Sequence, residues 1–365
     1  MKLKYFCVLI LGFGILLPTH AQEESELLKE IQSLREQIGN LRHEFDQIDK
    51  GIDDLMWYNK VGDVAFIDKV RLTGPPLGKD KFQATQGRGN PLFYENPYRI
   101  QTYLFIPKSV DPTKKYPLMV LPHGGVHSNF NTFYAHIIRE LIAQEYVVVA
   151  PEYRGSTGYG GGYYRAIDYG GLEVEDVKAC RDYMVESYDM VDPNRVGIMG
   201  WSHGGLITLM NLFNHPDGYK VGYAGVPVSD LIARMGYKTQ GYRELYSVDY
   251  HIGETAYQNT EEYKKRSPAW QAEKLKTPLL IHTNTNDSDV NVLEVQHLIK
   301  SLQAAKKDFE YQVYDSIPGG HTFDRMDTNF AREVRLKVYT FLGSYLNPPR
   351  LFRNVGEIRQ AGYGY

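Results

Sequence analysis

Apolar and polar positions follow two different periods along this chain of 365 residues. Between residues 27 and 55, apolar side chains recur at alternating spacings of four and three, the stripe of a long amphipathic or coiled-coil helix. From residue 117 onwards, short apolar runs alternate with segments of helical period, which predicts an α/β fold with a mostly parallel, doubly wound sheet. Residues 63–72 and 98–106 have the pattern of strands, joined by a Gly/Pro-rich segment over 73–91. They could form an antiparallel hairpin that leads the sheet.

The amino-terminal stripe consists of large apolar residues: Leu27, Ile31, Leu34, Ile38, Leu41, Phe45, Ile48, Ile52 and Leu55. Isoleucine stands at most a positions and leucine at most d positions, a combination that favours a parallel dimer. Glu30 and Arg35 fall where g–e′ ion pairs form across such a dimer. The alternative is a long helix that packs its apolar face on the body of its own chain. The stripe thus predicts a helical arm over residues 22–58 that either forms a homodimer through residues 27–55 or folds back on itself.

One short motif, Gly200-Trp201-Ser202-His203-Gly204-Gly205, carries the clearest chemical information. It lies between an apolar run at 196–199 and a segment of helical pattern at 206–212, so it occupies a strand–turn–helix junction. In a nucleophile elbow the turn is sharp, and glycines two before and two after the serine give the backbone the room it needs. This context predicts that the Ser202 hydroxyl stands above the sheet as a nucleophile. An ordinary Gly/Ser turn is the alternative.

A serine nucleophile needs a base to take its proton and a carboxylate to orient that base, in the chain order serine, acid, histidine. The apolar run 278–282 precedes a polar loop with Asp287 and Asp289, and His321 later follows a strand and two glycines. We interpret His321 as the base because the unperturbed pKa of histidine, about 6.5, suits proton transfer at neutral pH. Asp287 is the favoured acid. Asp289 and Asp230 are the alternative acids. A carboxylate that is not the acid would be an ordinary loop residue that caps a helix or faces water.

A glycine-rich turn supplies a candidate oxyanion hole. The apolar run 117–121 leads into Pro122-His123-Gly124-Gly125. A His-Gly-Gly turn after an early strand brings a backbone N–H close to the nucleophile, and the second donor is expected to be the N–H of His203. A plain strand-to-helix loop is the alternative.

Together with several further segments, these motifs resemble the catalytic domain of the prolyl oligopeptidase family of serine peptidases. The matching segments, between about residues 95 and 347, are Lys115-Tyr116-Pro117-Leu118, His123-Gly124-Gly125, Tyr153-Arg154-Gly155-Ser156-Thr157-Gly158-Tyr159-Gly160, Gly171-Leu172-Glu173-Val174-Glu175-Asp176, the Ser202 elbow, Pro227-Val228-Ser229-Asp230, Lys276-Thr277-Pro278-Leu279-Leu280-Ile281-His282, Asp287 with Val290, and Gly320-His321. The resemblance implies an α/β-hydrolase fold and a triad of Ser202, Asp287 and His321. It also implies that the N–H groups of Gly125 and His203 line the oxyanion hole.

The chain departs from the family pattern at three points. Family members usually carry a β-propeller before the hydrolase domain, and the roughly 95 residues that precede it here are too few for several four-stranded blades. In some members a tyrosine hydroxyl serves the oxyanion hole where His123 stands. The family's usual His-Gly before the acid is His282-Thr283 here, and the loop that follows is one residue longer.

Two enzyme classes fit these motifs. The expected function is a secreted serine peptidase that works through an acyl-enzyme, and the alternative is a carboxylesterase or carbohydrate acyl esterase of the same fold. A helical scaffold with an inactive hydrolase is a third class, which the complete set of serine, acid and histidine disfavours. No cofactor and no metal are expected, because no cluster has ligand spacing such as His-Glu-x-x-His.

The amino terminus and the charge balance indicate the compartment and the partners. Lys2 and Lys4 precede an apolar run over 5–17, and Thr19-His20-Ala21 ends it, which is typical of a secretory signal cleaved after Ala21. An uncleaved anchor is the alternative, although the run is short for a bilayer. A net charge of −3 does not indicate a nucleic-acid partner. The expected partners are peptides or acyl esters, and the signal predicts a secreted or periplasmic location. Only Cys180 would remain after cleavage, which excludes an intramolecular disulfide.

The expected domain order is a signal peptide over 1–21, a helical arm over 22–58, an α/β-hydrolase domain over 62–347 and a tail, potentially loose, over 348–365. A lid is expected at 231–266, where tyrosines could line a substrate pocket or pack the underside of the lid. These tyrosines are Tyr237, Tyr242, Tyr246, Tyr250, Tyr257 and Tyr263. Arg154 and Arg234 could reach a substrate carboxylate.

Overall fold

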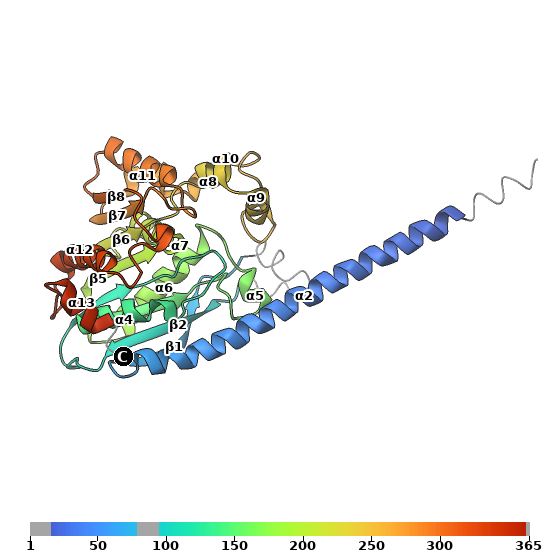
Figure 1. The fold of residues 1–365 in the computed structure, drawn as a ribbon. Helices are drawn as coiled ribbons and strands as arrows, with labels where there is room; N and C mark the ends of the chain where they lie inside the picture. Colours follow the sequence, from blue (N-terminus) through green and yellow to red (C-terminus); the bar gives the residue numbers. More distant parts are fainter. Residues whose placement is uncertain (1–15, 79–94, 363–365) are drawn as a thin grey trace, which may run out of the picture.

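An eight-stranded sheet between two layers of helices forms the body of the protein (Figure 1). The computed structural model describes residues 16–78 and 95–362. The strands are β1 (Ala65–Gly74), β2 (Tyr98–Pro107), β3 (Tyr116–Val120), β4 (Val147–Glu152), β5 (Val191–Trp201), β6 (Val221–Gly225), β7 (Leu279–Asn284) and β8 (Glu310–Tyr314). Their order across the sheet is β1-β2-β4-β3-β5-β6-β7-β8. The β1–β2 and β2–β4 pairs are antiparallel and the other pairs are parallel.

This topology confirms the predicted mostly parallel sheet and its leading antiparallel hairpin. Helices cover both faces of the central strands, so those strands are buried on both sides and carry continuous apolar runs rather than alternating ones. Most of the Gly/Pro-rich segment predicted to join β1 and β2 lies outside the described residues.

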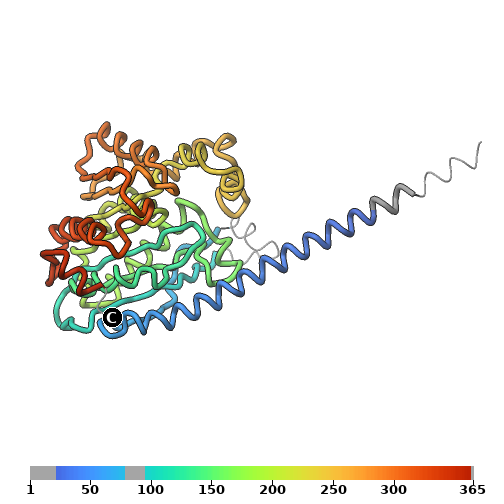
Figure 2. The backbone as a smooth tube through the Cα atoms, in the orientation of Figure 1, coloured from blue at the N-terminus to red at the C-terminus, as the bar shows by residue number. Residues whose placement is uncertain are grey.

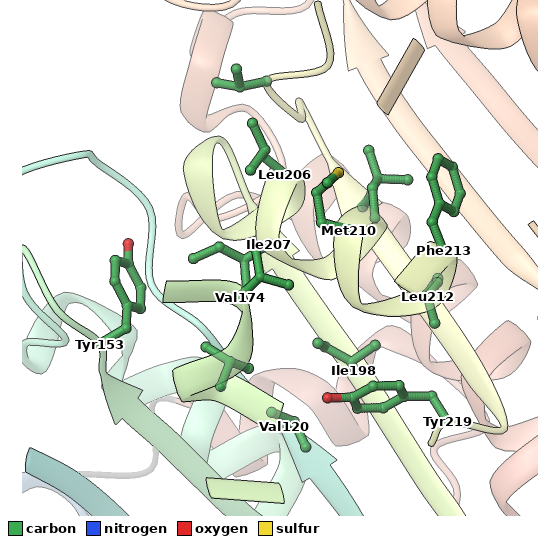
Figure 3. Close-up of a cluster of buried hydrophobic side chains, with 14 of the residues drawn as sticks. Val120, Tyr153, Val174, Ile198, Leu206, Ile207, Met210, Leu212, Phe213 and Tyr219 are labelled. Atoms are coloured by element: carbon green, nitrogen blue, oxygen red, sulfur yellow. The ribbon is translucent and has the colours of Figure 1, made fainter. Parts of the chain in front are cut away.

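Two hydrophobic cores hold the helices to the sheet. The helices are α2 (Leu16–Val61), α4 (Ala135–Ala143), α5 (Gly161–Tyr164), α6 (Leu172–Ser187), α7 (His203–Asn214), α8 (Leu231–Tyr237), α9 (Gln240–Ser247), α10 (Thr260–Lys265), α11 (Val292–Ala304), α12 (Asn329–Leu346) and α13 (Val355–Gly362). One core joins the sheet to α6, α7 and α11, and the other joins it to α4, α12 and the end of α2. Figure 3 shows part of the first core, where Leu212 of α7 lies near Ile198 of β5. The helix that follows the elbow is therefore anchored on the sheet.

The arm is one helix of 46 residues whose later part lies against the body and whose earlier part extends beyond it (Figures 1 and 2). Its apolar stripe is not covered by the body of its own chain. Phe45 is 66% exposed and Leu55 is 72% exposed, although Lys50 and Trp57 on the same helix are buried. The arm therefore docks through the face opposite the stripe. Residues 1–15, which hold most of the predicted signal peptide, lie outside the described residues.

The carboxyl-terminal tail is packed as far as the structure describes it, to Gly362, so the suggestion that it could be loose is wrong for residues 348–362. The chain leaves α12 before the Pro348-Pro349 pair and returns as α13, which packs against α4 and α12. Ile358 is fully buried there, and the Arg139 guanidinium donates a hydrogen bond to the Ala361 carbonyl at 3.1 Å. Burial of an apolar side chain and a satisfied backbone carbonyl offset the entropy that ordering this segment costs.

Candidate active site

The turn between β5 and α7 places Ser202 in a strained backbone conformation. Its φ is 59° and its ψ is −121°, a left-handed arrangement that non-glycine residues rarely adopt and that clusters at functional sites. The turn leaves no room for side chains at its glycines. A Cβ on Gly200 would lie 2.4 Å from the Gly204 carbonyl oxygen, and a Cβ on Gly204 would lie 2.4 Å from the Pro122 carbonyl oxygen. The glycine spacing of the motif thus follows from close approach of two backbone segments.

His321 and Asp287 come together beyond the carboxyl ends of β8 and β7, at the same edge of the parallel sheet as this turn. His321 lies in a short 3₁₀ turn, Gly320–Thr322, after β8, and its Nδ1 is 2.7 Å from Asp287 Oδ2. The other oxygen of Asp287 accepts hydrogen bonds at 2.8 Å from the backbone N–H groups of Asp289 and Val290. Asp287 is buried and fixed by its own loop, so it can orient the imidazole.

The Ser202 hydroxyl and the His321 imidazole are not hydrogen-bonded to each other in the described structure. Such contacts are often long in enzymes without substrate and tighten in the Michaelis complex. His321 Nε2, the nitrogen that a serine proton would reach, lies 3.6 Å from Asp289 Oδ2.

The two alternative acids have other contacts. Asp289 is about half exposed, and its Oδ1 accepts a hydrogen bond from Lys238 Nζ at 2.6 Å. Burial disfavours its charged form, but the Lys238 hydrogen bond and the charge of His321 outweigh this, so the pKa of Asp289 is lowered. Asp230 caps α8 and binds His297 Nδ1 at 2.6 Å, a different histidine. Of the three carboxylates, Asp287 is the one that binds His321 Nδ1.

The His-Gly-Gly turn lies directly against the elbow. A Cβ on Gly124 would be 3.0 Å from the Trp201 carbonyl oxygen and 3.4 Å from Ser202 Cβ, and Gly125 has a φ of 80° that favours glycine. In the described part of the chain, the backbone N–H groups of Gly125 and His203 donate to no protein acceptor in the turns and loops. Two such donors beside a strained serine are what an oxyanion requires.

The His123 side chain does not face the substrate side. It is fully buried, its ring stacks on Tyr153 with centroids 4.2 Å apart, and its Nε2 is 2.9 Å from Ser156 Oγ and 3.3 Å from Glu152 Oε2. This imidazole therefore holds the turn from the protein interior and does not replace the tyrosine hydroxyl that some family members use.

Sequence reasoning missed a link between the elbow and the histidine loop. Trp201 Nε1 donates to Asp324 Oδ2 at 2.6 Å, and the Tyr223 hydroxyl donates to the same oxygen at 2.8 Å. Asp324 lies three residues after His321, and the next residue, Arg325, donates to the His321 carbonyl. The residue before the nucleophile is thus tied to the loop of the proposed base. A carboxylate three residues after the Gly-His motif was the available indication.

Arg154 and Arg234 are wrongly predicted as ligands of a substrate carboxylate. Both are buried: Arg154 forms an ion pair with Asp176 at 2.7 Å, and Arg234 with Glu294 at 2.9 Å. These buried ion pairs hold both guanidinium groups inside the protein, although Arg154 Nη1 has no hydrogen-bond partner among the described residues. The lid tyrosines are mixed, since Tyr246 is fully buried whereas Tyr257 is 95% exposed, so packing accounts for part of the set.

A comparison with known proteins identifies the family. The model of the prolyl oligopeptidase family matches residues 131–348, more than half of the chain. The chain therefore belongs to the prolyl oligopeptidase family of serine peptidases. An uncharacterized peptidase of Bacillus subtilis, YuxL, is 27% identical over 255 residues, which are 69% of this chain and 37% of that protein. Dipeptidyl peptidase 8 of Mus musculus is 33% identical over 222 residues, 58% of this chain and 24% of that protein.

Solved structures share the fold. Acylaminoacyl peptidase of Pyrococcus horikoshii aligns with a TM-score of 0.64 at 19% identity, over 81% of this chain and 44% of that chain. A puromycin-hydrolyzing peptidase of Mycobacterium tuberculosis aligns with a TM-score of 0.62 at 23% identity, over 77% of this chain and 39% of that chain. The body is thus the α/β-hydrolase fold of this family's catalytic domains. The chain spans well under half the length of the curated relatives it matches.

Proposed function

We propose that this chain is a serine peptidase that cleaves its substrate through an acyl-enzyme carried on Ser202. One observation carries the proposal: His321 is paired at 2.7 Å with the buried carboxylate of Asp287, and hydrogen bonds through Asp324 and Arg325 tie its loop to Trp201, the residue before the strained Ser202. Membership of a peptidase family supports it. A serine hydroxyl is a weak nucleophile at neutral pH, so this arrangement of base and acid is what activates it.

Each residue has a defined task in the proposed reaction. Ser202 Oγ attacks the scissile carbonyl carbon while His321 Nε2 takes the hydroxyl proton, and Asp287 stabilises the imidazolium that forms. The carbonyl oxygen becomes an oxyanion that accepts hydrogen bonds from the N–H groups of Gly125 and His203. When the intermediate collapses, the C–N bond breaks and His321 gives its proton to the leaving amine. Water then repeats the sequence in place of the serine and releases the acid.

The test is a comparison of purified wild type and Ser202→Ala. The substrates are dipeptidyl and acylaminoacyl amides, because relatives carry these names, together with aryl and acetyl esters. The variant should fold but lose on the order of 10⁴-fold or more in kcat. Undiminished turnover by the variant would exclude Ser202 as the nucleophile. Hydrolysis of esters without any cleavage of amides would favour the esterase alternative.

We also propose that residues 1–21 are a secretion signal, so that the mature protein begins at Gln22 in the periplasm or outside the cell. Two lysines, an apolar run and a small residue at position 21 support this proposal. Of the helices among the described residues, none combines the length and apolarity that a membrane span requires. Mass spectrometry of the protein recovered from the producing cell tests it, and an intact Met1 terminus would contradict it.

A further inference from the structure

The outward face of α2 is a continuous apolar stripe that the described part of the chain leaves open. Its residues are between 37% and 72% exposed: Leu27, Ile31, Leu34, Ile38, Leu41, Phe45, Ile48, Ile52 and Leu55. Apolar patches of this extent on a soluble protein mark interaction surfaces. The stripe runs without a break from the free half of the helix into the half that lies on the body.

The way in which the arm docks explains why the stripe stays open. His43, Lys50 and Trp57 follow one another at intervals of seven, and they contact the body. The Trp57 ring stacks on Phe130 with centroids 5.3 Å apart, and the His43 ring lies 5.1 Å from that of Tyr164. With the stripe at positions a and d, these three residues occupy position f, which lies opposite the a/d seam. Docking through f turns the seam away from the body along its whole length.

We propose that the stripe binds the same stripe of a second copy of this chain, as a parallel two-stranded coiled coil. The residue types favour this occupant, because isoleucine predominates at a and leucine at d. In the parallel register Glu30 faces Arg35 of the second copy, an attractive pair, whereas Glu44 faces Asp49, an unfavourable one. The seam is apolar throughout, so burial of its side chains stabilises the pair, and these two charge pairs roughly offset each other.

Light scattering on the mature full chain tests the pairing. Wild type should have twice the mass of one chain, and Ile38→Asp, which puts a charge into the seam, should have the mass of one chain. Asn40→Asp is the matched control, because it adds the same charge on the same helix outside the stripe, and it should remain a dimer. A wild-type monomer, or a dimer that survives Ile38→Asp, would overturn the proposal. Under oxidation Leu34→Cys should link the two copies, and failure to link would rule out the parallel register.

The inner face of the same helix carries an independent feature, a buried lysine. The Lys50 side chain is 2% exposed. Its Nζ lies 2.8 Å from Glu152 Oε1 and donates a hydrogen bond to the Phe130 carbonyl oxygen at 2.5 Å. A lysine is rarely buried unless it is paired, and here its shortest contacts are to the hydrolase body, whereas Asp53 and Asp54 of the arm lie farther away at 3.6 and 3.8 Å.

Glu152 connects this lysine to the turn beside the nucleophile. The Glu152 side chain is fully buried at the end of β4, and its Oε2 accepts a hydrogen bond from the Phe130 N–H at 3.0 Å. The same oxygen is 3.3 Å from His123 Nε2. One carboxylate therefore holds both ends of the segment from His123 to Phe130, which contains Gly125. Burial raises the pKa of Glu152, but the charge of Lys50 and the His123 hydrogen bond outweigh it and lower this pKa to about 2.

We infer that Lys50 is a positioning residue for the oxyanion hole, acting through Glu152 on the segment that carries Gly125. This inference rests on the proposed hydrolase function. Removal of Lys50 leaves a buried carboxylate without its cation, and either its protonation or its movement loosens the turn. Oxyanion donors act only when they are held in place before the charge develops, so the loss should appear in kcat more than in KM.

The test compares Lys50→Met with Lys69→Met in the full chain. Lys69 also ties the arm to the body, through Asp54, but it does not contact Glu152 in the described structure. A structural role for the arm would affect both variants alike. We expect kcat to fall on the order of tenfold in Lys50→Met, with KM and the dimer unchanged, and to stay near the wild-type value in Lys69→Met.

A second variant keeps the inference testable if Lys50→Met does not fold. Glu152→Gln retains the shape of the side chain and should show the same loss in kcat as Lys50→Met. In both variants Ser202 should also react more slowly with a serine-directed phosphonate than in wild type. Equal kcat values in wild type and either folded variant would overturn the positioning role. If wild type itself is inactive while phosphonate does not label Ser202, the proposed function fails instead.

Discussion

Replacement of Gly204 by alanine should separate catalysis from folding at this site. The new Cβ would lie 2.4 Å from the Pro122 carbonyl oxygen and 2.8 Å from that of His123, distances below 3.0 Å that real Cβ atoms essentially never show. The obstacle is backbone, so the turn that carries Gly125 must retreat by more than half an ångström. Loss of one oxyanion donor costs about 10²–10³-fold in kcat, and a displaced donor should cost part of that, roughly 10- to 100-fold. This corresponds to about 1.4–2.7 kcal/mol of transition-state stabilisation.

The assay is steady-state kinetics on a peptide amide, combined with thermal unfolding of the same preparation. The overlap should also destabilise the fold by roughly 1–3 kcal/mol, so kcat must be measured well below the unfolding temperature. Gly241→Ala is the matched control, because no atom lies within 4 Å of a Cβ built at this helical glycine. It should keep its kcat and gain slightly in stability. An unchanged kcat in a folded Gly204→Ala protein would refute the placement of the oxyanion hole.

Three further outcomes are expected. Because the triad acts as a unit, His321→Ala should cost about as much as Ser202→Ala, and Asp287→Asn should cost as much or less. A larger loss in Asp289→Asn than in Asp287→Asn would reverse the assignment of the acid. A serine-directed phosphonate should abolish activity and a metal chelator should leave it unchanged, and the opposite pattern would overturn the reaction class. The folded-state pKa of Glu152 is about 2 against an ordinary 4.5, so its contribution to stability is present above pH 4.5 and lost as the pH falls toward 2. The free energy of unfolding, measured with urea, should therefore fall more steeply between pH 4.5 and pH 2 in wild type than in Glu152→Gln.

Local constraints explain why much of the site could be predicted from the sequence. The elbow needs glycines at set distances from Ser202 because two backbone segments approach within van der Waals contact there. Order along the chain then pointed to His321 and Asp287, which the structure places 2.7 Å apart. Periodicity located the sheet for a similar reason, since strands buried on both faces must be apolar throughout.

Features that depend on contacts between distant residues could not be predicted in this way. Glu152, Asp324 and the buried pairs of Arg154 and Arg234 all depend on partners far along the chain, which no local pattern specifies. The heptad stripe was visible, but it does not tell which face of the helix docks. Trp57, seven residues after Lys50, was an indication that the opposite face is also used.

The bond between Trp201 and Asp324 has a consequence for when the enzyme can become active. The two residues are 123 positions apart in sequence, and Arg335 reaches back 195 positions to Glu140. During synthesis Ser202 therefore emerges from the ribosome long before the loop that holds His321, and these contacts can form only after α12 has emerged as well. Such long-range contacts also make folding slow. If the proposed function holds, the nascent chain carries a serine elbow without its base, and so cannot cleave its neighbours, until residues 310–346 have been made and folded.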